Sequence, residues 1–267
     1  MEKRSRISEV FARHAKAGGK PVLNVYCTAG FPQPGSTIQV MQALQDAGAD
    51  LIELGMPYSD PLADGPVIQH SSAVALAGGM TIARLLEQLR AFRQAQGGAG
   101  IPVILMGYMN PVLQYGFEQF CRDAAEAGAD GLILPDLPEF EFESEYGAII
   151  RQYGLDFIFL VTPETSEQRV RRLDQLSSGF LYAVSSSSTT GKDKEMGEVT
   201  AYLQRLRSMG LRNPVLVGFG IKDRASFRAA CSQADGAIIG SAYIRMLEQA
   251  TDITAATKAF LHDIQGD

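Results

Sequence analysis

One acidic residue stands in a run that is otherwise apolar. Glu53 is the third residue of Leu51–Gly55, and the two-residue alternation of a strand puts it on one face with Leu51 and Gly55. A carboxylate in such a run costs free energy unless it is paired or its pKa is raised. A general acid or base that works near neutral pH needs this environment, so the pattern predicts a catalytic glutamate. The alternative is a glutamate with a structural hydrogen-bond partner.

Two further carboxylates follow on a proline-stiffened segment. Asp60 and Asp64 lie within 57–66, which is long enough to bend back over the end of a preceding strand. Both are candidates for chemistry. An aspartate beside proline or glycine more often bonds its own backbone in a turn, so this alternative stays open for each.

Two glycine-bearing turns near the carboxyl terminus suggest an anion site. Segments 217–221 and 239–242 each end an apolar run, and they contain Gly220, Gly240 and Ser241. Glycine lets backbone N–H groups approach an anion, and a helix that starts there favours negative charge. The pattern predicts a phosphate site made by the Ser241 hydroxyl and the amides around the two glycines; tight-turn geometry is the alternative.

Other polar residues follow apolar runs along the chain. The serine-rich stretch 185–191 and the charge run 192–195 that follows it are expected to form a loop whose hydroxyls close over a ligand, although a solvated loop is equally consistent. Tyr108, Asn110, Asp136 and Tyr182 also stand at or near the ends of such runs. They are expected near the same site.

Several classes of protein are disfavoured. The histidines His14, His70 and His262 do not cluster, and the three cysteines match neither a disulfide framework nor a metal motif, so no metal is predicted. We find no Walker motif, dinucleotide fingerprint or nucleophile elbow. The net charge of −6 argues against a nucleic-acid surface.

The amino-terminal segment is charged and amphipathic, with no hydrophobic signal-peptide core, and no stretch approaches about 18 uninterrupted apolar residues. We therefore expect a cytoplasmic protein without a membrane span.

The elements that must position these residues alternate along the chain. Eight apolar runs are expected as strands, at 22–27, 51–55, 102–106, 131–135, 157–161, 180–184, 215–218 and 237–239. Helical periodicity intervenes near 37–47, 81–94, 117–127, 139–152, 166–173, 199–209, 224–231 and 254–264.

Eight strand-helix units with parallel strands predict one (β/α)8 barrel domain over 1–267, with a doubly wound sheet as the alternative. In a barrel the active site lies at the carboxyl ends of the strands, where the candidate residues fall. Three glycines, Gly48, Gly128 and Gly154, are expected to cap helices in the left-handed conformation. Ile7, Val10 and Phe11 have helical spacing and predict an extra helix covering the barrel's bottom.

The run from Leu51 to Gln69 resembles, almost throughout, the signature segment of the tryptophan synthase alpha subunit family. The motifs at 108–111, 134–138, 179–182 and 218–221 follow in the family's order, and the resemblance extends from about Val22 to Met246. It implies a barrel that cleaves indole-3-glycerol phosphate to indole and glyceraldehyde 3-phosphate by a retro-aldol reaction. It also implies no cofactor in this subunit, pyridoxal phosphate in a beta subunit that receives the indole, and an α2β2 heterotetramer.

The resemblance assigns roles to residues of this chain. It implies that Glu53 transfers protons and that Asp64 lies near the indole nitrogen. It implies a substrate-binding set of Tyr26, Thr28, Tyr108, Tyr182, Thr190, Gly191, Phe219, Gly220, Gly240 and Ser241, and partner-contacting loops that carry Asp60, Asn110 and Asp136.

One position departs from the family. Ser186 stands where many members carry an arginine in the sixth loop, so an arginine contact to the closed loop or to the phosphate is not expected here. Three alternative functions remain: a stand-alone lyase that releases indole, a silent subunit that activates its partner, and another phosphate-binding barrel isomerase or synthase.

Overall fold

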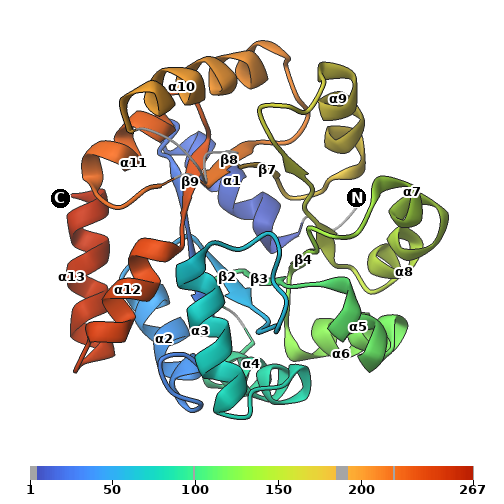
Figure 1. Ribbon diagram of the computed structural model, residues 1–267, viewed down its shortest axis with the longest axis vertical. Helices are drawn as coiled ribbons and strands as arrows, with labels where there is room; N and C mark the ends of the chain where they lie inside the picture. The colour runs from blue at the N-terminus through green and yellow to red at the C-terminus, as the bar shows by residue number, and fades with distance from the viewer. Residues whose placement is uncertain (1–4, 99, 185–191, 219, 267) are drawn as a thin grey trace.

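The strands form one parallel sheet that curls into a barrel. The computed structural model describes residues 5–98, 100–184, 192–218 and 220–266. The strand order is β5-β4-β3-β2-β1-β9-β8-β7-β6, and each strand runs parallel to its neighbours in this order (Figure 1). The strands are β1 (Val22–Thr28), β2 (Leu51–Gly55), β3 (Val103–Met106), β4 (Gly131–Ile133), β5 (Asp156–Phe157), β6 (Leu160–Val161), β7 (Leu181–Val184), β8 (Val215–Gly218) and β9 (Gly236–Ile239).

The barrel closes through the chain between β5 and β6. The N–H of Ile158 donates to the carbonyl of Leu132 in β4 at 3.1 Å, and the N–H of Tyr182 in β7 donates to the carbonyl of Phe159 at 3.0 Å. The single strand expected at 157–161 is therefore two short strands. Its first half pairs with one neighbour and its second half with the other, so neither ladder runs its whole length.

Helices surround the strands as a ring, and the first helix lies inside the outline of that ring, across one end of the barrel (Figure 1). They are α1 (Arg6–Lys16), α2 (Ser36–Asp46), α3 (Pro66–Ala77), α4 (Ile82–Ala95), α5 (Met109–Tyr115), α6 (Phe117–Ala127), α7 (Glu139–Glu141), η1 (Phe142–Tyr146), α8 (Gly147–Gln152), α9 (Glu167–Leu176), α10 (Lys192–Ser208), α11 (Arg224–Cys231), α12 (Ser241–Gln249) and α13 (Ile253–Gln265). The expectation of a (β/α)8 barrel is confirmed.

The helix predictions needed corrections in three places. Helices α3 and α5 were not expected, because α5 is short and α3 consists largely of small and apolar residues without a clear polar face. Helix α10 begins at Lys192, so the charge run 192–195 that was expected in a loop is its first turn. Helix α12 begins at Ser241, where the predicted anion site required a helix start. The helix expected at 139–152 is interrupted by the π-helical segment η1, which shifts the register of its backbone hydrogen bonds.

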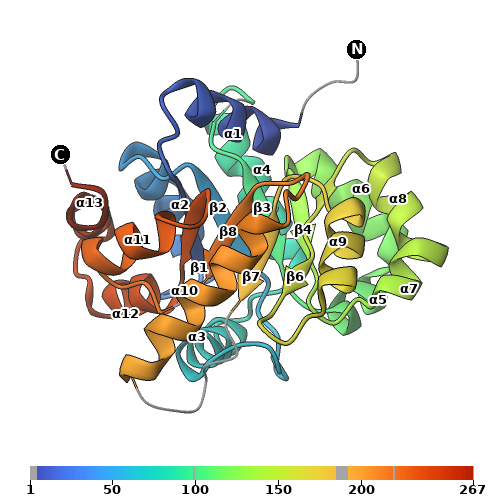
Figure 2. The same ribbon diagram turned by 90° about the horizontal axis from the view of Figure 1, so that it is seen from above.

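Helix α1 covers the amino-terminal end of the barrel, as predicted. Figure 2 shows it on the side of the strands opposite α3. Ile7 is fully buried, and a Cβ added to Gly131 or Gly179 would lie 3.2 or 3.1 Å from its side chain. Phe11 contacts Phe180 with ring centroids 6.2 Å apart. The floor of the barrel is therefore packed by side chains of α1.

The repeated glycines cap helices as expected. Gly48, Gly128 and Gly154 have φ of +87°, +94° and +70°, which is the left-handed region that favours glycine. Gly48 and Gly128 are each followed two positions later by an aspartate that binds the sheet. Asp50 and Asp130 accept hydrogen bonds from backbone N–H groups of β1 and β3 at 2.9 and 2.8 Å, so the repeat anchors the amino-terminal edge of the sheet.

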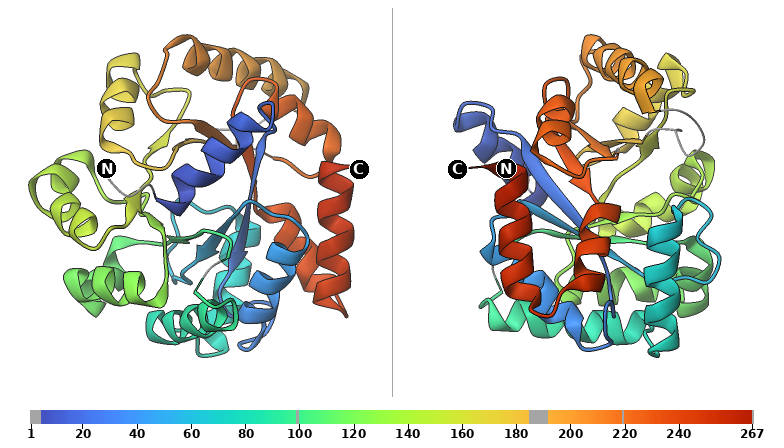
Figure 3. Two further views of the ribbon diagram at one scale, coloured as in Figure 1. Left: turned by 180° about the vertical axis from the view of Figure 1, so that it is seen from behind. Right: turned by 60° about the vertical axis from the view of Figure 1, so that its left-hand side comes forward.

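The two ends of the barrel thus differ. Figure 3 shows α1 and the outer helices from behind, where the amino-terminal strand ends are covered. Among the helices of the described residues, none is long and apolar enough to cross a membrane. The open end is the one toward which the strands point.

Candidate active site

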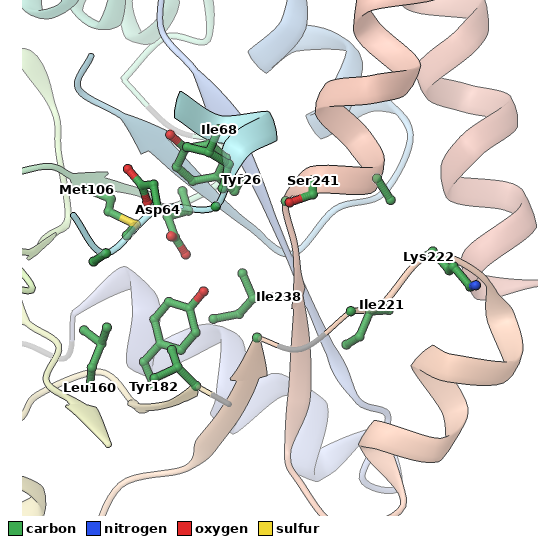
Figure 4. Close-up of a pocket in the computed structure, with 18 of the residues that line it drawn as sticks. Tyr26, Asp64, Ile68, Met106, Leu160, Tyr182, Ile221, Lys222, Ile238 and Ser241 are labelled. Atoms are coloured by element: carbon green, nitrogen blue, oxygen red, sulfur yellow. The ribbon is translucent and has the colours of Figure 1, made fainter. Parts of the chain in front are cut away.

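A pocket of about 320 Å³ lies at the carboxyl ends of the strands. Figure 4 shows Asp64, Tyr182 and Leu160 on one side of it and Ser241 and Lys222 on the other. Its polar lining comes from strands β1, β2 and β7, from the loop after β2 and from the start of α12. The pocket therefore combines residues from the whole length of the chain.

Glu53 is the buried carboxyl group of this pocket. It lies on β2, opposite Tyr26 of β1 in the sheet register, and is 1% exposed. Its Oε2 accepts a hydrogen bond from Asn24 Nδ2 at 3.0 Å. Burial raises the pKa of Glu53 to about 8; the Asn24 hydrogen bond opposes this rise and the charge of Asp64 adds to it. At neutral pH the carboxyl group is mostly protonated.

Asp64 belongs to the loop between β2 and α3. Its N–H donates to the carbonyl of Pro61, and the adjacent Ala63 N–H donates to the Tyr108 hydroxyl at 3.1 Å. Burial raises the pKa of Asp64 to about 6, and a hydrogen bond from Tyr108 limits the rise. At neutral pH this side chain is mostly ionised, so the pocket holds one acid and one carboxylate.

Two tyrosine rings fit into the pocket because glycines stand opposite them. A Cβ at Gly55 would collide with the Tyr26 hydroxyl, and a Cβ at Gly218 would collide with the Tyr182 ring. Burial raises the pKa of both tyrosines well above the usual value. Both hydroxyls therefore remain neutral and can donate or accept hydrogen bonds.

The opposite end of the pocket can hold an anion. Helix α12 starts at Ser241, directly after Gly240, and its first-turn N–H groups have no intrahelical acceptor. Gly220 lines the same end and has φ of +43°. Lys222 and Arg245 add positive charge there. Backbone donors, a hydroxyl and two cations at a helix start are the groups that bind phosphate.

The comparisons identify the family. The family model described as tryptophan synthase alpha chain matches residues 11–265. This chain belongs to the tryptophan synthase alpha chain family. The match spans every strand of the barrel.

Related proteins agree with this assignment. The tryptophan synthase alpha chain of Bacteroides thetaiotaomicron is 45% identical over 249 residues, which cover 93% of this chain and 94% of that protein. That of Flavobacterium johnsoniae is 49% identical over 231 residues, covering 86% and 90%. The crystal structure of the alpha subunit from Legionella pneumophila has a TM-score of 0.89 at 37% identity, covering 98% of each chain. Membership implies a lyase-type role in tryptophan biosynthesis.

Most of the predicted site residues meet in this pocket. Its lining includes Tyr26, Glu53, Asp64, Tyr182, Gly220, Gly240 and Ser241. Thr28 and Tyr108 lie behind the lining. The Thr28 hydroxyl bonds Ser71 of α3 at 2.6 Å and reaches the Tyr26 hydroxyl at 3.4 Å, so its contacts support Tyr26. Thr190, Gly191, Phe219 and Ser186 lie outside the described residues.

The residues expected on partner-contacting loops lie at the rim. Asp60 is exposed. Asn110 Nδ2 donates to the Tyr58 hydroxyl at 3.1 Å, and both Asp136 oxygens accept from the Met109 N–H at 3.0 Å. The loops after β2, β3 and β4 are thus tied together at the open end of the barrel.

Sequence reasoning missed the apolar walls and the cations of the pocket. The walls include Ile68, Met106, Leu160, Ile221 and Ile238, and nothing in an apolar residue distinguishes a pocket wall from core. Lys222 and Arg245 could have been found, since one follows Gly220 by two residues and the other lies one helical turn after Ser241. Among the described residues, no group of three or more His, Cys, Asp or Glu could hold a metal ion.

Proposed function

We propose that this chain cleaves indole-3-glycerol phosphate to indole and glyceraldehyde 3-phosphate. The observation that carries the proposal is the separation of two carboxyl pKa values in one pocket, about 8 for Glu53 and about 6 for Asp64. Environments that push two pKa values apart assign one group as the acid and the other as the base. The anion site at Gly220, Gly240 and Ser241 takes the phosphate.

The reaction starts with a proton. Protonated Glu53 gives its proton to C3 of the indole ring, which places positive charge on the ring nitrogen. Ionised Asp64 accepts the hydrogen bond of that N–H and stabilises the charge. The nonpolar walls of Leu160 and Ile238 surround the ring and exclude water.

The carbon–carbon bond then breaks. Ionised Glu53 takes the proton of the glycerol hydroxyl next to C3, the hydroxyl carbon becomes the aldehyde, and the electron pair of the broken bond restores the aromatic ring. Glu53 ends protonated and Asp64 ends ionised, so the side chains return to their starting states. No cofactor takes part in these steps. The phenols of Tyr26 and Tyr182 hold the reacting groups in place.

We also propose that a tryptophan synthase beta subunit binds at the open end of the barrel, in an α2β2 assembly. Large apolar side chains are exposed on the rim: Leu62 is 94% and Phe140 75% exposed. They lie on the loop after β2 and in α7, beside the predicted contact residues Asp60 and Asp136. Exposed apolar groups near a ligand site are typical of a protein interface.

The deciding experiment measures indole release from indole-3-glycerol phosphate by the purified chain, alone and with a beta subunit. Glu53→Gln removes the proton donor, and Glu126→Gln on the exposed face of α6 is the matched control. Activity that rises with the partner, is lost in Glu53→Gln and persists in the control supports the proposal. Indole release at the same rate with and without the beta subunit indicates a stand-alone lyase. No indole under either condition indicates a binding subunit or a different phosphate substrate.

A further inference from the structure

Asn24 is a polar side chain placed in the barrel interior without a structural need for it. It is 0% exposed, and its Oδ1 is buried with no hydrogen-bond partner among the described residues. A buried amide with an unpaired oxygen costs free energy, and an apolar residue of similar volume would avoid that cost. The packing therefore does not explain why an asparagine stands here.

The contact that Asn24 makes is with Glu53. Asn24 lies on β1 two residues before Tyr26, on the same face of the strand. Its Nδ2 donates to Glu53 Oε2 at 3.0 Å. Glu53 lines the pocket, so with Oε2 held by the amide, Oε1 is the oxygen left for substrate.

This hydrogen bond fixes where the acidic proton sits. An oxygen that accepts from an amide N–H is the carbonyl-like oxygen of a protonated carboxyl group, so the proton occupies the other oxygen. We propose that Asn24 is the positioning residue of Glu53, an inference that rests on the proposed function. Its amide group holds Oε2 in both protonation states of Glu53 and so confines the exchanged proton to Oε1.

The same contact adjusts the acidity of Glu53. The titratable groups near the carboxyl group are Tyr26 and Tyr182, which face the pocket, Asp64 in the loop after β2, and Cys27 on the opposite face of β1. The charge of Glu53 raises the pKa values of Tyr26, Tyr182 and Cys27, and the charge of Asp64 raises that of Glu53. The Asn24 hydrogen bond lowers the pKa of Glu53, against burial and the charge of Asp64. A carboxyl group that both gives and takes a proton needs a pKa near the working pH.

The test compares Asn24→Leu, which removes the donor, with Asn24→Ser, which keeps a smaller donor. Val25→Ala is the control, because Val25 is equally buried on the opposite face of β1. We expect Asn24→Leu to move the basic limb of the kcat/KM profile upward by about one pH unit and to lower kcat about tenfold, with KM changed less than about threefold. Because serine keeps a donor, we expect Asn24→Ser to lie between wild type and Asn24→Leu in both the position of the basic limb and kcat. Val25→Ala is expected to leave the basic limb in place.

A second readout does not need activity. The Glu53 carboxyl carbon can be titrated by NMR in ¹³C-glutamate-labelled protein, with Glu53→Gln identifying the signal. An upward shift of its pKa in folded Asn24→Leu supports the proposal, whereas an unchanged pKa and an unchanged basic limb overturn it. Wild-type protein that releases no indole would refute the proposed function, while the NMR titration would still decide whether Asn24 controls Glu53.

Discussion

The ring of Tyr182 lies against Gly218 of the neighbouring strand so closely that a Cβ on Gly218 would overlap its Cε2 and hydroxyl oxygen. The φ of Gly218 is not positive, so any residue can adopt this backbone conformation. Any loss of activity when Gly218 is replaced therefore has a steric cause. We expect Gly218→Ala to displace the phenol and lower kcat/KM by roughly 10-fold to 100-fold, measured as indole release.

The control for this substitution is Gly35→Ala, at a position where an added Cβ meets nothing within 4 Å. Its activity should stay within about twofold of wild type. Equal activity of Gly218→Ala and wild type would show that the position of the Tyr182 ring does not matter for turnover.

The pH dependence of kcat/KM should be bell-shaped. The active form carries ionised Asp64 and protonated Glu53, so activity rises as pH passes about 6 and falls as it passes about 8. The measurement is kcat/KM for indole release from pH 5 to 9.5. A profile that keeps rising above pH 8 would contradict the role of protonated Glu53 as the acid.

The stability contribution of Glu53 should change with pH in the opposite sense to that of a carboxylate whose pKa is lowered by folding. The unfolded chain loses the Glu53 proton near pH 4.5, whereas the folded chain keeps it to about pH 8. Between these values the folded state binds more protons, so this group lowers the free energy of unfolding as pH rises.

The Glu53→Gln variant does not titrate in this window. We therefore expect it to match wild type near pH 4.5 and to be more stable at pH 8, by on the order of 3 kcal/mol. Urea unfolding at both pH values measures the difference. A variant less stable than wild type at pH 8 would show that the ionised carboxylate is well solvated in the fold.

The cations at the anion end should affect substrate binding more than turnover. Lys222 and Arg245 are exposed, so each contributes modestly and in a salt-dependent way. We expect Lys222→Met to raise KM about threefold at low ionic strength with kcat unchanged, and Lys258→Met on the exposed face of α13 to change neither. An unchanged KM, and an unchanged inhibition constant of inorganic phosphate, would remove Lys222 from the anion site.

The rim should govern the effect of the partner. Phe140→Ser removes an exposed apolar contact, so we expect the beta subunit to bind more weakly, by about tenfold, while the chain alone keeps its rate. We also propose that the loop carrying Asp60 transmits the ligand state of the beta subunit to the pocket, and Asp60→Asn tests this role in the same assay. Full activation of Asp60→Asn by the beta subunit would refute that role.

The fold was predictable because its signal is repeated. Each buried strand is a short apolar run, and these runs alternate along the chain with segments of helical periodicity, as a (β/α)8 barrel requires. What could not be predicted depends on distant parts of the chain. The break between Phe157 and Leu160 exists because two different neighbours pair with the two halves. Helix α3 is stabilised by packing on β1 and α12 rather than by a polar face of its own.

The candidate site shows the same division. Glu53 was predictable because a carboxylate interrupts an apolar run, and Ser241 because glycine precedes it at the end of a strand. Asn24 was not, since the role of an asparagine in a strand depends on its hydrogen-bond partner, which here is Glu53, 29 positions away. The supporting position of Thr28 beneath Tyr26 also depends on Ser71, which is 43 positions away.

The packing of α1 across the amino-terminal strand ends closes that end of the barrel. Ile7 and Phe11 fill it, so the pocket opens toward the carboxyl ends of the strands, on the side away from α1. A protein seated on the rim then becomes the wall of the exit path. A beta subunit bound at this rim, as proposed above, would therefore control both the entry of substrate and the release of product.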